Sequence, residues 1–353
     1  MKSGSLIVVY GSYGYTGQLI VEACKAKQLS LILAGRNEQA LALQSESTGY
    51  PYEVVETSET EKLVHLLKPA HLVIHCGGPF IFTARRMVEA CLQARTHYTD
   101  ITGEIAVFEL LKKYDQQARD SGIIVLPGIG FDVVPTDCMA SHLKRRLPEA
   151  THLELAFATS GGGASRGTTK TAILGLGEES RIRKDGTIIK VPLHQGMKEI
   201  NFGSFRSLAA RIPWGDISTA YTSTGIPNIE VYMGVNKKIA RLISMSRYFN
   251  WLLSMRWIKI LLLKRFDKIS GPTSQNRSKS KSIVKGKVWN EHSIYESRLE
   301  LADGYTFTAV ASVAIAQRIL KGNFKTGYQT PSLVYGPDFI LEFETISRTD
   351  TPS

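Results

Sequence analysis

The chain has 353 residues, of which 43% are hydrophobic and 21% are charged, so it is long enough for two domains and has the composition of a globular protein. Its formal net charge is +11, but the segment from Lys237 to Lys287 holds 14 Lys or Arg and one acid, Asp267. The rest of the chain is therefore slightly acidic. This distribution argues against a nucleic-acid-binding protein, in which basic charge covers a whole face.

The four cysteines predict a reduced, cytoplasmic environment, since they include no Cys-x-x-Cys pair and give no disulfide framework. The apolar run Leu6–Tyr10 is too short for a signal peptide core, and no apolar stretch reaches the roughly 18 residues of a membrane-spanning helix. The histidines show no metal-ligand spacing, so no metal is expected.

Residues 1–126 alternate apolar strand-like runs with helical patterns, which predicts a Rossmann-type doubly wound parallel sheet. The predicted strands are Ser5–Tyr10, Leu29–Ala34, Tyr52–Val55, His71–Cys76, Tyr98–Ile101 and Gly122–Leu126. The predicted helices are Gly14–Lys27, Asn37–Ser47, Thr83–Ala94 and Glu104–Ser121.

Residues 127–305 have a different character. Amphipathic runs such as His152–Ala158 and Asn228–Val235 predict a second, α+β domain with a mostly antiparallel sheet, for substrate binding or dimerisation. The polar stretch Ser270–Lys281 predicts a mobile loop. A helix over 306–320 is expected to pack back on the first domain.

The strongest chemical signal is the run Gly11-Ser12-Tyr13-Gly14-Tyr15-Thr16-Gly17, which follows a predicted strand and opens a helix. Gly11 permits a tight turn, Gly14 lets the backbone approach a pyrophosphate, and Gly17 lets the helix pack on the sheet. The helix N-terminus then offers N–H groups and a positive dipole end to the phosphates. The alternative is a turn cluster without a ligand.

The identity of the dinucleotide depends on the end of the second strand. An NAD site usually carries an acid there for the ribose hydroxyls, but this strand ends in Ala34-Gly35-Arg36. The Arg36 guanidinium suits a 2′-phosphate, so NADP(H) is favoured over NAD, with an ordinary surface arginine as the alternative. After the fourth strand, Gly77-Gly78-Pro79-Phe80 is expected to border the cofactor.

These segments resemble the saccharopine dehydrogenase-like family of NADP-binding oxidoreductases, in particular the branch of trans-acting enoyl reductases. The resemblance covers most of the chain, but little of about 190–287, and no amino-acid-binding arginine set is evident. The matching segments are Gly11–Gly17, Ala34–Arg36, Gly77–Phe80, His97–Glu104, Pro127–Asp137, Ser160–Gly163 with Gly167-Thr168, and Thr330-Pro331.

The resemblance implies an NADPH-dependent enzyme that transfers hydride to a C=C or C=O bond. The apolar basic segment tilts the substrate toward a hydrophobic, acyl or lipid-like molecule. Two alternatives stay open: an imine or amino-acid dehydrogenase of the saccharopine type, and a non-catalytic NADP-binding protein associated with a membrane or a partner.

The expected catalytic residues are Tyr98, Asp132 and Lys170, and Asp100 is expected to contact the cofactor. All four lie in motif segments that should converge near the nicotinamide, where a proton donor is useful beside a hydride donor. The structural alternatives are a helix cap for Asp132, a buried strand aromatic for Tyr98 and a solvated lysine for Lys170.

Residues 251–265 combine tryptophans and leucines with Arg256 and Lys259 on one helical face. Segment 237–287 could therefore make peripheral contact with a membrane or an acidic acyl carrier protein, or form a lid over an apolar substrate. The remaining alternative is a buried helix at a domain or homodimer interface.

Overall fold

The computed structural model describes residues 5–160, 165, 167, 169–170, 173, 177–253, 255–266, 271–344 and 346–351. The chain divides into two compact units, residues 1–134 with 305–334 and residues 135–304 with 335–353. The division after Val134 places the loop that follows the sixth strand in the first unit.

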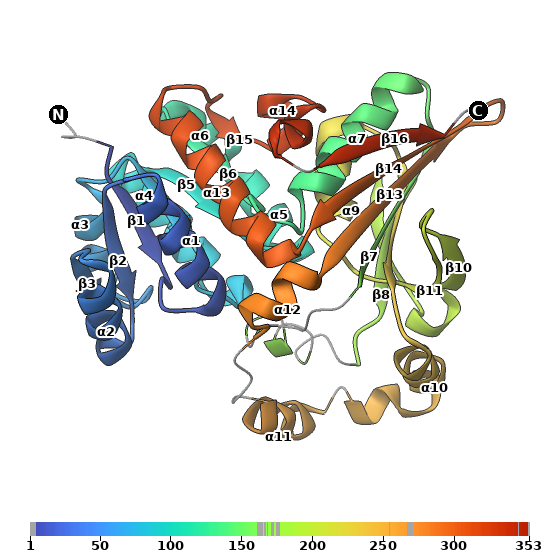
Figure 1. Ribbon diagram of the computed structural model, residues 1–353, viewed down its shortest axis with the longest axis horizontal. Helices are drawn as coiled ribbons and strands as arrows, with labels where there is room; N and C mark the ends of the chain where they lie inside the picture. Colours follow the sequence, from blue (N-terminus) through green and yellow to red (C-terminus); the bar gives the residue numbers. More distant parts are fainter. Residues whose placement is uncertain are drawn as a thin grey trace. The chain divides into compact units, whose positions relative to one another are not determined.

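The first unit contains a seven-stranded sheet in the order β15-β6-β5-β4-β1-β2-β3, in which every pairing is parallel (Figure 1). Its strands are β1 (Ile7–Tyr10), β2 (Leu31–Gly35), β3 (Tyr52–Val54), β4 (Leu72–His75), β5 (His97–Asp100), β6 (Ile124–Leu126) and β15 (Gly327–Tyr328). All four residues of β1 and of β4 are buried, which explains their unbroken apolar runs. The predicted parallel sheet is confirmed.

The helices of this unit are α1 (Tyr15–Ala26), α2 (Glu38–Thr48), α3 (Thr60–Leu67), α4 (Ala84–Ala94), α5 (Ile105–Leu111), α6 (Asp115–Asp120) and α13 (Gly304–Leu320). Short 3-10 turns lie at η1 (Phe80–Phe82) and η2 (Lys112–Tyr114). The single helix expected over Glu104–Ser121 is thus interrupted at η2. The Asp115 carboxylate at the start of α6 accepts a hydrogen bond from the Tyr328 N–H at 2.7 Å, which ties this break to β15.

The second unit contains a nine-stranded sheet with the main order β10-β11-β12-β7-β13-β14-β16 and a β8–β9 hairpin beside β12. Among the described residues of this unit, only the β12–β7 pairing is parallel, so the mostly antiparallel sheet is confirmed. The strands are β7 (His152–Ser160), β8 (Ser180–Lys184), β9 (Thr187–Val191), β10 (Met197–Asn201), β11 (Arg206–Arg211), β12 (Asn228–Gly234), β13 (Lys281–Trp289), β14 (Ile294–Ala302) and β16 (Ser347–Thr351).

The helices of the second unit are α7 (Val134–Arg146), α9 (Asp216–Thr224), α10 (Lys237–Leu253), α11 (Arg256–Phe266) and α12 (Ser274–Lys279), with 3-10 turns η3 (Leu193–Gln195) and η4 (Phe339–Glu342). The short helix α14 (Pro331–Tyr335) lies almost entirely in the first unit. The expectation of a loop over Ser270–Lys281 was wrong, because α12 occupies its centre. The Thr273 hydroxyl caps this helix by accepting a hydrogen bond from the Asn276 N–H at 3.3 Å. Among the described residues, no helix combines the length and apolar character needed to cross a bilayer.

Candidate functional site

Two glycine-containing loops meet at the carboxyl ends of β1 and β4. These strands are neighbours, while the next strand after β1 lies on its other side, so the chain reverses its order here. Gly11 has φ +77°, and a Cβ added to it would lie 2.8 Å from the backbone nitrogen of Gly77. The contact therefore requires glycine, and it lies where doubly wound sheets bind their ligands.

The first loop leads into the N-terminus of α1. Gly14 is the N-cap residue and brings no side chain to cover the helix end. A Cβ on Gly17 would lie 2.5 Å from the Gly11 carbonyl oxygen, so the helix can begin this close to the loop only with glycine there. Bare backbone beside a helix N-terminus fits a dinucleotide pyrophosphate.

Hydrogen bonds from two helices hold the same loop. The buried Ser12 hydroxyl donates to Gln44 Oε1 at 2.7 Å, and Gln44 Nε2 donates to the Ser12 carbonyl at 3.0 Å. Gln18 Nε2 donates to the Tyr13 carbonyl at 3.1 Å. The Ser12 side chain thus binds α2, which leaves the loop backbone for a ligand. Gln44 was not anticipated, because nothing in its local sequence relates it to Ser12.

Arg36 directly follows β2 and is exposed. The ring of Tyr13 lies over Gly35, where an added Cβ would be 2.6 Å from the ring. Burial raises the pKa of Tyr10 to about 12, and the positive charge of Arg36 opposes this rise, which places Arg36 near the end of β1. Within the described part of the chain, the Arg36 guanidinium has no ion-pair partner.

The second loop, Gly77–Phe80, is fixed by side chains that the sequence did not single out. His75 Nδ1 accepts from the Gly77 N–H at 3.4 Å, so Nε2 carries the proton and lies 2.8 Å from Thr83 Oγ1. The Thr83 hydroxyl then donates to the Gly77 carbonyl at 2.9 Å. Burial lowers the pKa of His75 to about 3, so the ring stays neutral in this chain of bonds.

Glu104 holds the far side of this loop. Its two carboxylate oxygens accept hydrogen bonds from the N–H groups of Phe80 and Ile81 at 2.8 and 2.9 Å. Burial raises the pKa of Glu104, and the two backbone donors lower it. The carboxylate thus satisfies the N–H groups at the start of η1 and links the loops after β4 and β5.

Tyr98 and Asp100, on β5, are both fully buried. The Tyr98 hydroxyl donates to Asp100 Oδ2 at 2.5 Å, and Asp100 Oδ1 accepts from the N–H groups of Thr102 and Gly128 at 3.0 and 2.9 Å. Burial raises the pKa of Asp100 to about 6, and these donors act against the rise. The pair connects the end of β5 to the loop after β6.

Asp132 lies in the loop after β6 and is half-buried. A Cβ added to Gly103 would lie 2.8 Å from Asp132 Oδ2, so this carboxylate packs closely on the loop after β5. Burial raises the pKa of Asp132 to about 7. The structure therefore places a carboxyl group that can hold a proton near neutral pH at the same end of the sheet as the glycine loops.

Lys170 belongs to the second unit, where it is half-buried in a helical segment. The neighbouring glycine triplet, residues 161–163, and residues 166 and 168 lie outside the described residues. The structure thus brings together the predicted residues of the first unit and describes Lys170 separately.

Residues 7–126 match the family described as "Saccharopine dehydrogenase NADP binding domain". The chain is 28% identical over 203 residues to a saccharopine dehydrogenase-like oxidoreductase of Mus musculus, covering 50% of this chain and 47% of the relative. It is 27% identical over 293 residues to a lipid droplet localized protein of Caenorhabditis elegans, covering 72% and 67%. It is 32% identical over 158 residues to a trans-acting enoyl reductase of Mycobacterium ulcerans, covering 42% and 38%.

The fold is also similar to a solved structure, apo histidine-tagged saccharopine dehydrogenase (L-Glu forming) from Saccharomyces cerevisiae. The TM-score is 0.68 at 12% identity, over 99% of this chain and 100% of the other. The chain spans about half the length of the mouse relative. The glycine loops at the end of the parallel sheet lie inside the matched residues, so residues 7–126 form an NADP-binding domain of the saccharopine dehydrogenase type.

Proposed function

We propose that this protein is an NADPH-dependent reductase that acts on a C=C or C=O bond of a hydrophobic, acyl-type substrate. The observation that carries the proposal is the contact between the Gly11 and Gly77 loops at the end of the parallel sheet, within the NADP-binding domain. Relatives named as an oxidoreductase and as a trans-acting enoyl reductase support the reaction class.

In this proposal, bound NADPH supplies the hydride. The backbone of Gly11–Gly17 and the N-terminus of α1 bind the pyrophosphate, and Arg36 binds the 2′-phosphate. The loop Gly77–Phe80, held by His75, Thr83 and Glu104, lies beside the cofactor and orients it.

Asp132 is the proposed proton donor. Reduction of C=C or C=O needs a hydride at one atom and a proton at its neighbour, and a group with a pKa near neutral pH can supply that proton. Burial raises the pKa of Asp132 to about 7, so much of it is protonated at neutral pH. Tyr98 and Asp100, which are fully buried, are proposed as positioning residues that fix the loops on either side of it.

The proposed hydrophobic substrate is supported by the loop next to the cofactor. Ile81 and Phe82 are 44% and 65% exposed, so this loop offers apolar surface to a ligand. Lys170 is proposed to bind a carboxylate or phosphate of the substrate, which Lys170→Met should weaken as a raised KM with little change in kcat.

We also propose that the protein works at a membrane surface. The worm relative is named as a lipid droplet localized protein, and a surface location would give access to lipid-like substrates. The acyl carrier contact suggested by the basic segment is the alternative route to an acyl substrate.

The test is NADPH oxidation by the purified protein with a panel of enoyl, carbonyl and imine compounds, using NADPH deuterated at C4. Deuterium in a reduced enoyl or carbonyl product, lost in Asp132→Asn while NADPH binding persists, would support the proposal. Turnover of imines alone would assign saccharopine-type chemistry instead. NADPH binding without turnover of any compound would favour a non-catalytic NADP-binding role.

A further inference from the structure

One face of α10 is exposed while the opposite face is packed on its own unit. Ala240 is buried and Ile243 half-buried, and both join a cluster with residues of β11 and β12. The exposed positions recur at helical spacing, and they carry Arg241, Met245, Tyr248 and Trp251. Tyr248 and Trp251 are 59% and 64% exposed, an unusual placement for aromatic residues on a helix already anchored by its other face.

The next helix, α11, repeats this pattern. Trp257 is 61% and Leu261 60% exposed, and Ile260 lies near them on the same face of the helix. Arg256 and Lys264 fall on that face as well, while Ile258 and Leu262 are half-buried on the other. Within the second unit, α11 is therefore not a buried helix.

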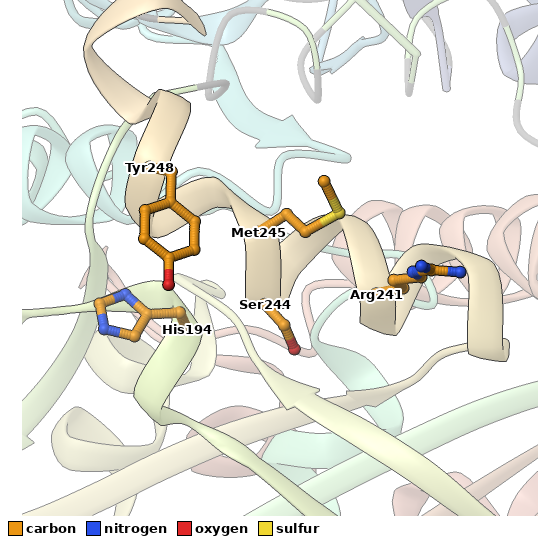
Figure 2. A pocket seen from close by; sticks show the side chains of 5 residues that line it. All are labelled: His194, Arg241, Ser244, Met245 and Tyr248. Carbon is orange, nitrogen blue, oxygen red and sulfur yellow. The ribbon is translucent and has the colours of Figure 1, made fainter.

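A hollow of about 450 Å³ lies along the exposed face of α10. Arg241, Ser244, Met245 and Tyr248 line it from α10, and His194 lines it from η3 (Figure 2). Figure 2 shows the Tyr248 hydroxyl directed toward the His194 ring, with Ser244 and Arg241 following along the helix. The hollow is lined along its length by a guanidinium, two hydroxyls and an imidazole, and each of these groups can donate a hydrogen bond to a phosphate oxygen.

The charged residues of α10 and α11 themselves have one sign, and Lys259 lies 3.9 Å from the Glu178 carboxylate of another segment. From Lys237 to Phe266 the sequence holds eight Lys or Arg and no Asp or Glu. A two-fold contact between copies of the chain through this face would set these cations against one another, which disfavours a homodimer here. An anionic lipid surface attracts such a cluster, and exposed Trp and Tyr favour the boundary between headgroups and acyl chains.

We propose that α10 and α11 form a docking surface for anionic phospholipid, with one headgroup phosphate held in the hollow lined by His194 and Arg241. The docking surface consists of the exposed side chains Arg241, Ser244, Met245, Tyr248, Trp251, Arg256, Trp257, Ile260, Leu261 and Lys264. This docking surface rests on the proposed membrane contact, but it does not depend on the reaction that the protein catalyses.

The test is flotation of the full chain with vesicles of phosphatidylcholine alone or mixed with phosphatidylserine, at low and high salt. Two double variants probe the surface: Trp251→Ser with Trp257→Ser, and Arg256→Gln with Lys264→Gln. Their matched controls are Leu43→Ser with Ile294→Ser, which are 61% and 50% exposed, and Lys62→Gln with Lys68→Gln, two exposed lysines at opposite ends of α3. Arg241→Gln probes the hollow.

The wild type and both controls should bind the mixed vesicles but not phosphatidylcholine alone, and high salt should release them. The charge variant should bind roughly 10- to 25-fold more weakly, since each cation near an anionic surface contributes about a fivefold factor. The tryptophan variant should bind at least about tenfold more weakly than the wild type. Arg241→Gln should reduce the preference for anionic vesicles by about fivefold or more.

Equal binding of wild type and variants, or no binding to anionic vesicles, would overturn the proposal. The proposal would also be overturned if the wild type is a dimer in solution and the tryptophan variant is a monomer, because a second copy of the chain would then cover this surface. Capture by acidic acyl carrier protein without vesicle binding would assign the surface to that partner instead. NADPH affinity is measured on the same samples. Normal NADPH binding by a variant that no longer binds vesicles would show that the loss concerns the docking surface and not the proposed reductase function.

Discussion

The charged side chains near the glycine loops differ in burial, and this difference distinguishes their roles. Arg36 is exposed at the end of β2, where its guanidinium is available to a ligand. Asp100 is fully buried and its oxygens bind Tyr98, Thr102 and Gly128, so it is committed to the fold. Asp132 lies between these cases, half-buried with a raised pKa.

Replacing Arg36 by Ala should remove the preference for NADPH over NADH. A bidentate contact between guanidinium and phosphate contributes about 1.5–3 kcal/mol, so NADPH affinity should fall by roughly 10- to 100-fold while NADH affinity stays similar. Fluorescence titration of both nucleotides measures this, with Lys68→Ala as an exposed control. An unchanged ratio of the two affinities would remove Arg36 from the site.

Replacing Asp132 by Asn should change the pH dependence of turnover. Proton donation needs the protonated carboxyl group, whose pKa is raised to about 7, so the rate in the wild type should fall as pH rises through about 7. In the Asn variant this decrease of the rate with pH should be absent, and kcat should be lower by about 10²- to 10⁴-fold, with NADPH affinity retained. Steady-state rates from about pH 5 to pH 9 measure both effects. The same decrease of the rate with pH in the variant would assign the pKa to another group.

The same raised pKa predicts a stability effect. A carboxyl group whose pKa is higher in the folded state stabilises the fold below its unfolded pKa, and this contribution is lost as pH rises through the folded value. The melting temperature of Asp132→Asn should therefore gain on that of the wild type between about pH 4 and pH 8. A difference in melting temperature between the two proteins that stays constant across this pH range would contradict the burial of this carboxyl group.

At the scale of elements, the site depends on how the ends of neighbouring strands are joined. β1 and β4 bring the two glycine loops into contact, and β5 and β6 are tied together by Asp100. Glu104, just before α5, joins the loop after β5 to η1 after β4. The connections through Asp100 and Glu104 are hydrogen bonds between segments that are distant in the sequence.

Replacing Glu104 by Gln should loosen the loop Gly77–Phe80. Glutamine keeps one oxygen acceptor but turns an NH₂ group toward the second backbone N–H, so one charge-assisted bond becomes an unfavourable contact. We expect a loss of about 1–3 kcal/mol in the free energy of unfolding and several-fold weaker NADPH binding. Glu109→Gln, which breaks a partly exposed pair with Lys112, should cost less than about 1 kcal/mol.

Urea unfolding and nucleotide titration on both variants measure the two effects. A loss of stability without weaker NADPH binding would show that the Gly77–Phe80 loop does not bear on the cofactor.

At the scale of the whole molecule, the first unit is discontinuous. It is completed by residues 305–334, which supply α13 and β15. α13 buries Phe307, Val313, Ile315 and Ile319, and the Thr308 hydroxyl accepts a hydrogen bond from the Phe131 N–H at 2.9 Å. β15 adds the last parallel strand beside β6.

A fragment ending at Val134 should therefore fail to form a stable NADP-binding domain. It lacks the helix that covers the loop after β6 and leaves that strand as an edge. A second fragment, with 305–334 joined to 1–134 by a flexible linker, should recover a cooperative thermal transition and NADPH binding. Circular dichroism and nucleotide titration compare the two, and a stable, NADPH-binding first fragment would contradict the discontinuous unit.

The sequence alone determined features whose signals are local. The glycine spacing of Gly11–Gly17, the apolar runs of the buried strands and the placement of Arg36 after β2 are readable because each depends on neighbouring residues and on a fixed periodicity. The parallel sheet, the mostly antiparallel second sheet and NADP(H) as the cofactor followed from them. The concentration of positive charge in 237–287 is likewise a property of composition.

Only the tertiary structure decided which side chains face inward and which distant residues meet. Gln44 binds Ser12, Glu104 binds η1, and Asp100 binds the Gly128 N–H across strands, and no local pattern encodes these pairs. The exposure of Trp251 and Trp257 was also undetermined, because helical periodicity identifies an apolar face without saying what covers it. Burial and long-range pairing are properties of the packed chain, and they set the pKa values and bonds on which the proposed function depends.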